Sequence, residues 1–340
     1  MSGGTGATGR AAVIDGIGAY VPPGLVTNDD LAQRLDTSDA WIRSRTGIAE
    51  RYVVSPGTAT SDLAVEAGLR ALKSAGDDRV DAVVLATTTP DQPCPGTAPQ
   101  VAARLGLGQV AAFDVAAVCS GFLYGLATAS GLIAAGVADR VLLIAADAFT
   151  TLINPADRTT AVIFADGAGA VVLRAGTPDE PGAIGPQVLG SDGELSHLIT
   201  VPAGGSRQRS TGPPADPDDQ YFRMLGRDTY RHAVERMTAA SRQAAELAGW
   251  RLDDVDRFAA HQANARILDS VAERLAVPAE RQLTNIERVG NTGAASIPLL
   301  LSQATADGRL RAGHRVLLTA FGGGLSWGAT TLVWPEVQPV

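Results

Sequence analysis

The chain contains 340 residues, of which 45% are hydrophobic and 19% are charged, and its formal net charge is −8 at pH 7. This length suits one large domain or two ordinary ones, with a sizeable buried core. The negative charge argues against nucleic-acid binding by the protein as a whole, because a phosphate backbone would be repelled. An acidic partner would have to dock on a local basic patch.

Cysteine usage and the N-terminus bear on where the protein works. Two cysteines, Cys94 and Cys119, cannot build a disulfide framework. We therefore expect a reducing, cytoplasmic setting in which each is either packing or a reactive thiol. The first ten residues, MSGGTGATGR, lack the apolar segment of a secretory signal. We predict that residues 1–10 form a disordered tail.

Apolar runs mark the interior of the first part of the chain. The sequences AVVLATT at 82–88 and RVLLIAA at 140–146 predict buried strands. Residues 115–138 carry no charge and are numerous enough to cross a bilayer. They are rich in Ala, Gly, Ser and Thr, and no basic residues flank one end as an orientation signal. We therefore expect a helix in a soluble core and no membrane span.

The later part of the chain adds a long amphipathic helix and a polar loop. Apolar residues recur at three- and four-residue steps from Val234 to Leu247, which predicts a helix over 229–249 with Asp228 as its N-cap. Residues 203–220 are polar and rich in Gly and Pro, so they predict a surface loop or a mobile flap. Strands alternating with helices indicate a layered α/β fold.

The second half of the sequence resembles the first. Three pairs of segments match in the same order: 75–91 with 248–264, 101–107 with 271–277, and 134–147 with 309–322. The period of about 170 residues is too long for a solenoid and indicates a duplicated domain. We predict halves spanning 11–180 and 181–340, packed about a pseudo-twofold axis.

The duplication places candidate functional residues in equivalent positions. Cys119 lies 18 residues after Val101, and Asn291 lies 20 residues after the matching Val271. His261 follows a predicted strand at the point where Thr87 follows the matching strand. A pseudo-twofold axis would therefore bring Cys119 and Asn291 together, and we expect a functional cluster where the halves meet.

Cys119 lies in DVAAVCSGFLYGL, among small residues at the start of the predicted core helix. A free cysteine is most often buried packing. At a helix N-terminus, however, the positive end of the dipole lowers a thiol pKa and favours the thiolate. The residues alone support packing and nucleophilic catalysis about equally.

His261 stands out among the four histidines. His232 and His314 have ordinary surface settings, and His197 lies beside a Gly/Ser-rich loop that leaves its role open. His261 ends a buried strand and begins the polar sequence HQAN, and such clusters of buried polar groups often mark functional sites. No cysteine and histidine spacing suits zinc, so we expect no metal site.

Two glycine-containing turns complete the set of candidates. Asn291 in VGNTGAASIP is either an ordinary turn asparagine or an amide donor to a developing oxyanion. The three glycines of AFGGGLSWGA, at 320–329, make a sharp turn or offer backbone N–H groups to an oxyanion. The lysine and Ser/Thr of a phosphate-binding loop are missing.

These motifs together resemble the β-ketoacyl-acyl-carrier-protein synthase III family of the thiolase superfamily. The resemblance runs from about Ala11 to Trp334 and includes TSDAWIRSRTGIAER, PADRTT and FADGAGAVVL. It implies a duplicated five-layer αβαβα sandwich in a homodimer. It also implies an enzyme that loads an acyl group from acyl-CoA and condenses it with malonyl acyl carrier protein, with no other cofactor.

The resemblance also assigns roles to individual residues. Cys119 would be the acylated nucleophile, His261 and Asn291 would promote decarboxylation, and the backbone N–H groups of Cys119 and Gly323 would form the oxyanion hole. The coenzyme A contacts would be Thr37, Trp41, Arg45, Arg158 and Asn264, with the adenine between Trp41 and Arg158. The basic residues around the tunnel mouth, for carrier-protein docking, would be Arg231, Arg266 and Arg274.

The chain departs from the family pattern at three places. Gly293 replaces a common serine, so we expect a looser loop around Asn291. Cys94 stands where a bulky residue often closes the acyl pocket, so we expect starters larger than acetyl, and 203–220 resembles an insertion. Two other functions remain open: an acyltransferase that does not decarboxylate, and a non-catalytic partner subunit, which the presence of Cys119 disfavours.

Overall fold

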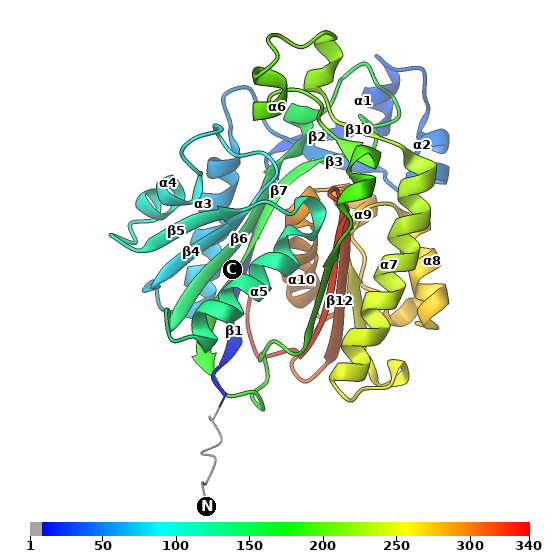
Figure 1. Cartoon of the computed structure of the whole chain (residues 1–340). Helices are drawn as coiled ribbons and strands as arrows, with labels where there is room; N and C mark the ends of the chain where they lie inside the picture. The colour runs from blue at the N-terminus through cyan, green and yellow to red at the C-terminus, as the bar shows by residue number, and fades with distance from the viewer. Residues whose placement is uncertain (1–8) are drawn as a thin grey trace, which may run out of the picture.

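The computed structural model describes residues 9–340. The predicted tail at 1–10 lies almost entirely outside the described residues. The described residues form two main sheets separated by helices, and two short sheets of two strands each (Figure 1).

The first sheet has five strands in the order β1 (Ala11–Tyr20), β7 (Asp166–Gly176), β6 (Arg140–Ala148), β4 (Ala82–Ala86) and β5 (Ala111–Val115). β6, β4 and β5 run parallel, whereas β7 is antiparallel to both of its neighbours. The buried strands predicted at 82–88 and 140–146 are confirmed as β4 and β6. β4 is apolar along its length and β6 is apolar from Val141 to Ala146, because helices cover both faces of the sheet.

The second sheet repeats this arrangement with four strands, β11 (Arg257–Ala260), β12 (Arg315–Gly322), β13 (Ser326–Val333) and β8 (Gln187–Ser191). β11 and β12 are parallel, and β13 is antiparallel to β12 and β8. β4, β6, β7 and β1 of the first sheet thus correspond to β11, β12, β13 and β8. The proposed boundary between residues 180 and 181 falls between β7 and β8.

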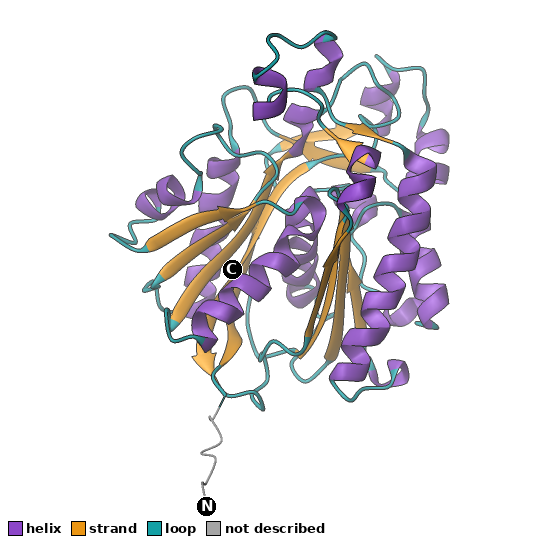
Figure 2. Ribbon diagram, in the orientation of Figure 1, coloured by secondary structure: helices purple, strands orange, loops and turns teal. Residues whose placement is uncertain are grey.

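Helices form three layers around the two sheets (Figure 2). α5 (Gly121–Ala134) and α10 (Ser296–Ala306) lie between the sheets, and α5 contacts strands of both. The outer layers are α3 (Thr60–Ala75) with α4 (Ala98–Arg104) on one side, and α7 (Gly226–Leu247) with α8 (Ala265–Leu275) on the other.

Side chains alternate between the faces of each strand, as Val83 and Val84 do when they pack into different core clusters. The predicted five-layer αβαβα sandwich is confirmed.

Shorter elements lie above the ends of the sheets. They are β2 (Gly24–Thr27), α1 (Asn28–Ala32), α2 (Asp39–Thr46), β3 (Glu50–Val53), β9 (Ile199–Thr200), α6 (Ser206–Arg209), β10 (Arg223–Met224) and α9 (Ile286–Val289). Residues 203–220 are largely exposed and contain α6, which confirms a surface segment.

Two local predictions need comment. The predicted amphipathic helix exists as α7, but it begins at Gly226, and its N-cap Leu225 makes no side-chain bond. Asp228 is therefore not the cap, because the helix extends one turn further back than its apolar pattern. The uncharged segment 115–138 contains the 14-residue α5. Among residues 9–340, no helix is both long and apolar enough to span a membrane.

Candidate active site

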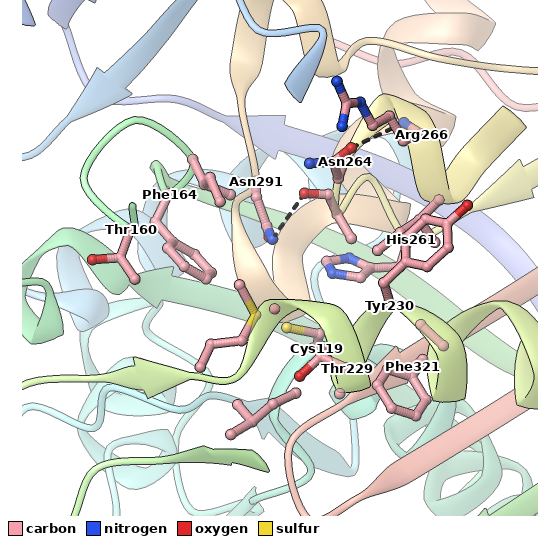
Figure 3. A pocket seen from close by; sticks show the side chains of 18 of the residues that line it. Cys119, Thr160, Phe164, Thr229, Tyr230, His261, Asn264, Arg266, Asn291 and Phe321 are labelled. Carbon is pink, nitrogen blue, oxygen red and sulfur yellow. Dashed lines mark hydrogen bonds between the residues drawn. The ribbon is translucent and has the colours of Figure 1, made fainter. Parts of the chain in front are cut away.

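The two central helices begin at the residues that the sequence marked as reactive. Cys119 lies in a short 3-10 turn (118–120) directly before α5, and Asn291 lies in the turn before α10. His261 follows β11 directly. These three side chains line one cavity of about 720 Å³ (Figure 3). The structure thus brings together residues that lie up to 172 positions apart in the chain.

The backbone around Cys119 is closely confined. Val118 has a φ of 47°, which a β-branched residue rarely adopts. Gly322, at the end of β12, approaches so closely that a Cβ there would lie 2.7 Å from the Cys119 nitrogen. Ser120 is fixed by a 2.6 Å hydrogen bond between its hydroxyl and that of Ser326. The position of the thiol is therefore set by the meeting of the two halves.

His261 is anchored by its backbone and by the next residue. Its N–H donates to the carbonyl of Thr319 on β12 at 2.8 Å, and its side chain is 1% exposed. The adjacent Gln262 receives a hydrogen bond from the Thr284 hydroxyl at 2.9 Å and donates its amide to Ala260 O at 2.9 Å. Gln262 is thus a buried support for the histidine.

Asn291 is held so that its amide nitrogen faces the cavity. Its backbone N–H donates to Ile163 O at 3.0 Å, and its own carbonyl accepts from Ala165 N at 2.8 Å. The side-chain oxygen accepts the Gly293 N–H at 3.0 Å, whereas the side-chain nitrogen makes only a 3.5 Å contact with Ala263 O (Figure 3). The NH₂ group is therefore the one available to a ligand.

Burial controls the charge state of both titratable groups. It lowers the pKa of His261 to about 3, so the imidazole is neutral near pH 7, and Nδ1 has no partner among residues 9–340. Burial, together with the charge of Asp147, raises the pKa of Cys119 to about 12. The expected lowering of this pKa is wrong, because desolvation and the charge of Asp147 outweigh the lowering by the backbone hydrogen bond.

Comparisons with known proteins identify the family. Residues 113–193 match the family model described as 3-oxoacyl-[acyl-carrier-protein (ACP)] synthase III, and residues 245–334 match its C-terminal model. The chain is 60% identical over 333 residues to β-ketoacyl-[acyl-carrier-protein] synthase III 3 of Streptomyces coelicolor, covering 97% of this chain and 99% of that protein. The chain belongs to the β-ketoacyl-acyl-carrier-protein synthase III family. It is a condensing enzyme of the acyltransferase class.

Solved structures agree with this assignment. The 3-oxoacyl-(acyl carrier protein) synthase III of Pseudomonas aeruginosa PAO1 superposes with a TM-score of 0.91 at 48% identity, covering 97% of this chain and 100% of that one. The priming β-ketosynthase from the R1128 polyketide pathway gives 0.89 at 34% identity, with 98% of each chain covered. OleA of Xanthomonas campestris, at 21% identity and 0.82, shares the fold.

The residues expected to contact coenzyme A gather at the cavity mouth. The guanidinium carbons of Arg45 and Arg158 lie 4.6 Å and 5.3 Å from the centre of the Trp41 ring. Arg45 and Asn264 line the cavity, and the Asn264 amide donates to Arg45 O at 3.1 Å. Thr37 does not line it, and its buried hydroxyl has no partner among residues 9–340.

The three arginines of the family's carrier-docking pattern have different settings. Arg266 lines the cavity and donates to Ser44 O at 2.8 Å. Arg231 is exposed on α7 and lies 3.5 Å from Asp228. Arg274 lies in the last turn of α8. Only Arg266 lines the cavity; Arg231 follows the lining residue Tyr230 on α7, whereas Arg274 lies about two turns farther along α8.

A second cavity of about 840 Å³ lies on the other side of the Cys119 backbone. It is lined by Val118 and Gly323, and it shares Ile199 and Phe222 with the first cavity. Gly323 thus faces the second cavity, whereas its neighbour Gly322 lines the first. Cys94 is exposed and lines neither cavity, although Pro93 lines the second.

Sequence reasoning missed one wall of the first cavity. Thr229, Ala233 and Met237 line it at four-residue steps along α7. Their helical face suggested ordinary core packing. Thr229 distinguishes this wall from ordinary core packing. Its buried hydroxyl lines the cavity and has no hydrogen-bond partner within residues 9–340. Within the same residues, no group of three or more His, Cys, Asp or Glu could hold a metal ion.

Proposed function

We propose that this enzyme takes an acyl group from acyl-CoA onto Cys119 and condenses it with malonyl acyl carrier protein, in fatty-acid initiation or polyketide priming. The observation that carries the proposal is the convergence of Cys119, His261 and Asn291 in one cavity. The family membership given above supports the same reaction.

In the first half-reaction, the sulfur of Cys119 attacks the thioester carbonyl. The bond between Sγ and the acyl carbon forms, the bond to the coenzyme A sulfur breaks, and the Cys119 proton ends on the departing thiol. The backbone N–H groups of Cys119 and Gly323 would hold the oxyanion. Because the pKa of Cys119 is raised, the free enzyme holds a thiol, and proton loss accompanies attack.

In the second half-reaction, the malonyl C–CO₂ bond breaks and leaves an enolate. A neutral His261, donating from Nε2, and the Asn291 NH₂ group would stabilise this charge. The enolate carbon then attacks the acyl carbon, a C–C bond forms, and Cys119 leaves as thiolate. Two neutral donors suit this step, because a cation would bind the malonyl carboxylate and oppose its loss.

The substrate-binding proposals follow the cavity outward. Trp41 and Arg158 would hold the adenine, with Thr37, Arg45 and Asn264 as further contacts. Arg231, Arg266 and Arg274 would dock the acidic carrier protein. No cofactor beyond the acyl-CoA substrate is needed.

The assembly proposals concern a homodimer in the cytoplasm. β5 is the outermost strand of its sheet, and Phe113 on it is 37% exposed, which supports a partner at this edge. A partner's loop carrying Cys94 would then close the acyl pocket, and the small side chain would leave room for starters larger than acetyl.

Intact-protein mass spectrometry with a panel of acyl-CoAs tests the proposal. We expect one acyl mass on the protein, located on the Cys119 peptide, and release of CO₂ when malonyl carrier protein is added. Acyl transfer to another acceptor without CO₂ release would instead establish the simple acyltransferase. A label that survives Cys119→Ala would refute the assigned nucleophile.

A further inference from the structure

Asp147 is a buried carboxylate beside the active site to which no role has been assigned. It lies near the end of β6 and is 0% exposed. No Lys, Arg or His within residues 9–340 forms an ion pair with it. A buried charge without a counter-ion is costly unless hydrogen bonds satisfy it. Its contacts should therefore reveal why it is retained.

The hydrogen bonds of Asp147 join the two halves of the molecule. Oδ1 accepts from the Thr88 N–H at 2.6 Å and from the Thr87 hydroxyl at 3.2 Å, both just after β4. Oδ2 accepts from the Ala294 N–H at 2.7 Å, in the turn that follows Asn291. One carboxylate thus ties the ends of β4 and β6 to the turn that carries the proposed amide donor.

Gly293 makes this contact possible. It has a φ of 59°, and a Cβ at this position would lie 2.3 Å from Asp147 Oδ2. The looser loop expected from Gly293 stays a prediction; in this chain glycine lies in close contact with the carboxylate, which an added Cβ would have to displace. The Gly293 N–H also holds the Asn291 side-chain oxygen at 3.0 Å.

The start of the nucleophile helix packs on the same turn. A Cβ on Gly121 would lie 3.2 Å from the Cβ atoms of Ala294 and Ala86. Small residues therefore bring the Cys119 segment, the end of β4 and the Asn291 turn into close contact. Movement of the turn would change the position of Asn291 relative to Cys119.

We propose that Asp147 is a positioning residue for the condensation step: its carboxylate clamps the turn after Asn291 and holds the Asn291 amide toward the cavity. This inference rests on the role proposed for Asn291. The carboxylate must act as an acceptor only, since all three of its main partners are donors. Protonation would place an O–H among them and loosen the clamp.

The electrostatic surroundings give the clamp a pH dependence. Burial raises the pKa of Asp147 to about 7, opposed by the N–H groups of Thr88 and Ala294 and aided by the charge of Asp166. The titratable groups coupled to it are Cys119 and Asp166, and the segments 87–89 and 292–295 carry no charged side chain. Condensation should therefore weaken as the pH falls through about 7.

The test compares Asp147→Asn with Asp166→Asn. Asp166 is an equally buried acid in the neighbouring strand β7, but its carboxylate accepts from Val54 and Thr150 and makes no hydrogen bond to the Asn291 turn. For Asp147→Asn we expect malonyl decarboxylation to fall by about tenfold or more, because one donor would then face the new NH₂ group, while acylation of Cys119 changes by less than about threefold. The fall in decarboxylation rate below about pH 7 should disappear. Asp166→Asn should retain this fall but shift it to lower pH, because the charge of Asp166 helps to raise the pKa of Asp147.

Equal losses in both half-reactions, or an unchanged fall in decarboxylation rate at low pH, would overturn the proposal. Gly293→Ala provides a second variant if Asp147→Asn does not fold, and it should show the same selective loss. Two readouts need no substrate and so separate a wrong clamp from a wrong function. A crystal structure of Asp147→Asn should show residues 291–295 displaced, and iodoacetamide should alkylate Cys119 with a lower pH midpoint. An undisplaced turn would refute the clamp even if the enzyme condenses as proposed.

Discussion

The ends of β6 and β12 occupy equivalent places in the two halves, but one presents a charged side chain and the other presents no side chain. In the repeat, Asp147 aligns with Gly322. Asp147 reaches across to the turn before α10, and Gly322 reaches across to the turn before α5. Each strand end therefore contacts the start of the other half's central helix. One contact uses a charged side chain and the other uses the absence of a side chain.

The difference shows how a duplicated fold acquires one active site. A symmetric dimer of halves would present two identical strand ends and two identical helix starts. Here the α5 start carries the thiol and receives a bare backbone, which leaves room for an acyl oxygen. The turn before α10 carries the Asn291 amide, and the Asp147 carboxylate of the other half holds this turn in place. The predictions below alter one side of this comparison at a time.

Removing the thiol should have the largest effect. Cys119→Ala should abolish acyl-enzyme formation, because no other group in the cavity can form the thioester. Cys94→Ala is the matched control and should still be acylated, since Cys94 is exposed and lines no cavity. Mass spectrometry after incubation with acyl-CoA measures both. Acylation lost in the Cys94 variant would contradict the assignment.

Adding a side chain at Gly322 should slow the first half-reaction. In Gly322→Ala, the new Cβ would press on the Cys119 nitrogen and move the proposed oxyanion donor. Loss of such a donor typically costs about two to three powers of ten in rate. Gly131→Ala, on the open side of α5, is the control and should acylate normally. Stopped-flow acylation rates decide the matter, and equal rates in the two variants would contradict this reading of Gly322.

Removing either proposed donor to the enolate, His261 or Asn291, should slow only the second half-reaction. His261→Ala and Asn291→Ala should still form the acyl-enzyme but lose roughly two to three powers of ten in malonyl decarboxylation. Release of CO₂ from labelled malonyl carrier protein reports the loss. Normal condensation by Asn291→Ala would refute the role proposed for Asn291 in stabilising the enolate.

The buried carboxylate of Asp147 should also make the free energy of unfolding depend on pH. The pKa of Asp147 is raised to about 7, above an ordinary value near 4. Between these values the folded protein keeps a proton that the unfolded chain releases. The contribution of Asp147 to the free energy of unfolding is therefore fully present below about pH 4 and is lost, by up to a few kcal/mol, as the pH rises from about 4 to about 7.

Asp147→Asn should flatten this dependence in urea unfolding at a series of pH values. Asp166 contributes to both proteins, so the difference between the two curves isolates Asp147. Parallel curves would show that Asp147 does not titrate in this range.

The smallest effect should come from the cavity mouth. Charge reversal at Arg266, which lines the mouth, should raise KM for carrier protein several-fold while KM for acyl-CoA changes less. Arg231 and Arg274 do not line the cavity, so reversal there should have weaker effects, because exposed charges farther from the mouth are screened by salt. Steady-state kinetics at low and high ionic strength measure this order. Equal changes in both KM values would argue against a docking face.

The sequence was sufficient to predict the three side chains that meet in the candidate site, but not the residues that hold them in place. Cys119, His261 and Asn291 each follow a recognisable strand or precede a helix, and the internal repeat indicated that they meet. Asp147 was missed because its partners, at 87–88 and 294, come close only through packing of the two halves. The pKa of Cys119 was predicted in the wrong direction because helix position is visible in sequence, whereas burial is not.

Trp41 gives the molecule a built-in optical reporter. The guanidinium groups of Arg45 and Arg158 both lie close to its indole ring, and indole emission responds to nearby cations and to stacked rings. An adenine inserted between Trp41 and Arg158 would replace a cation by an aromatic plane. Nucleotide occupancy would then be readable, without any attached label, as the part of the emission of the four tryptophans that is lost in Trp41→Phe.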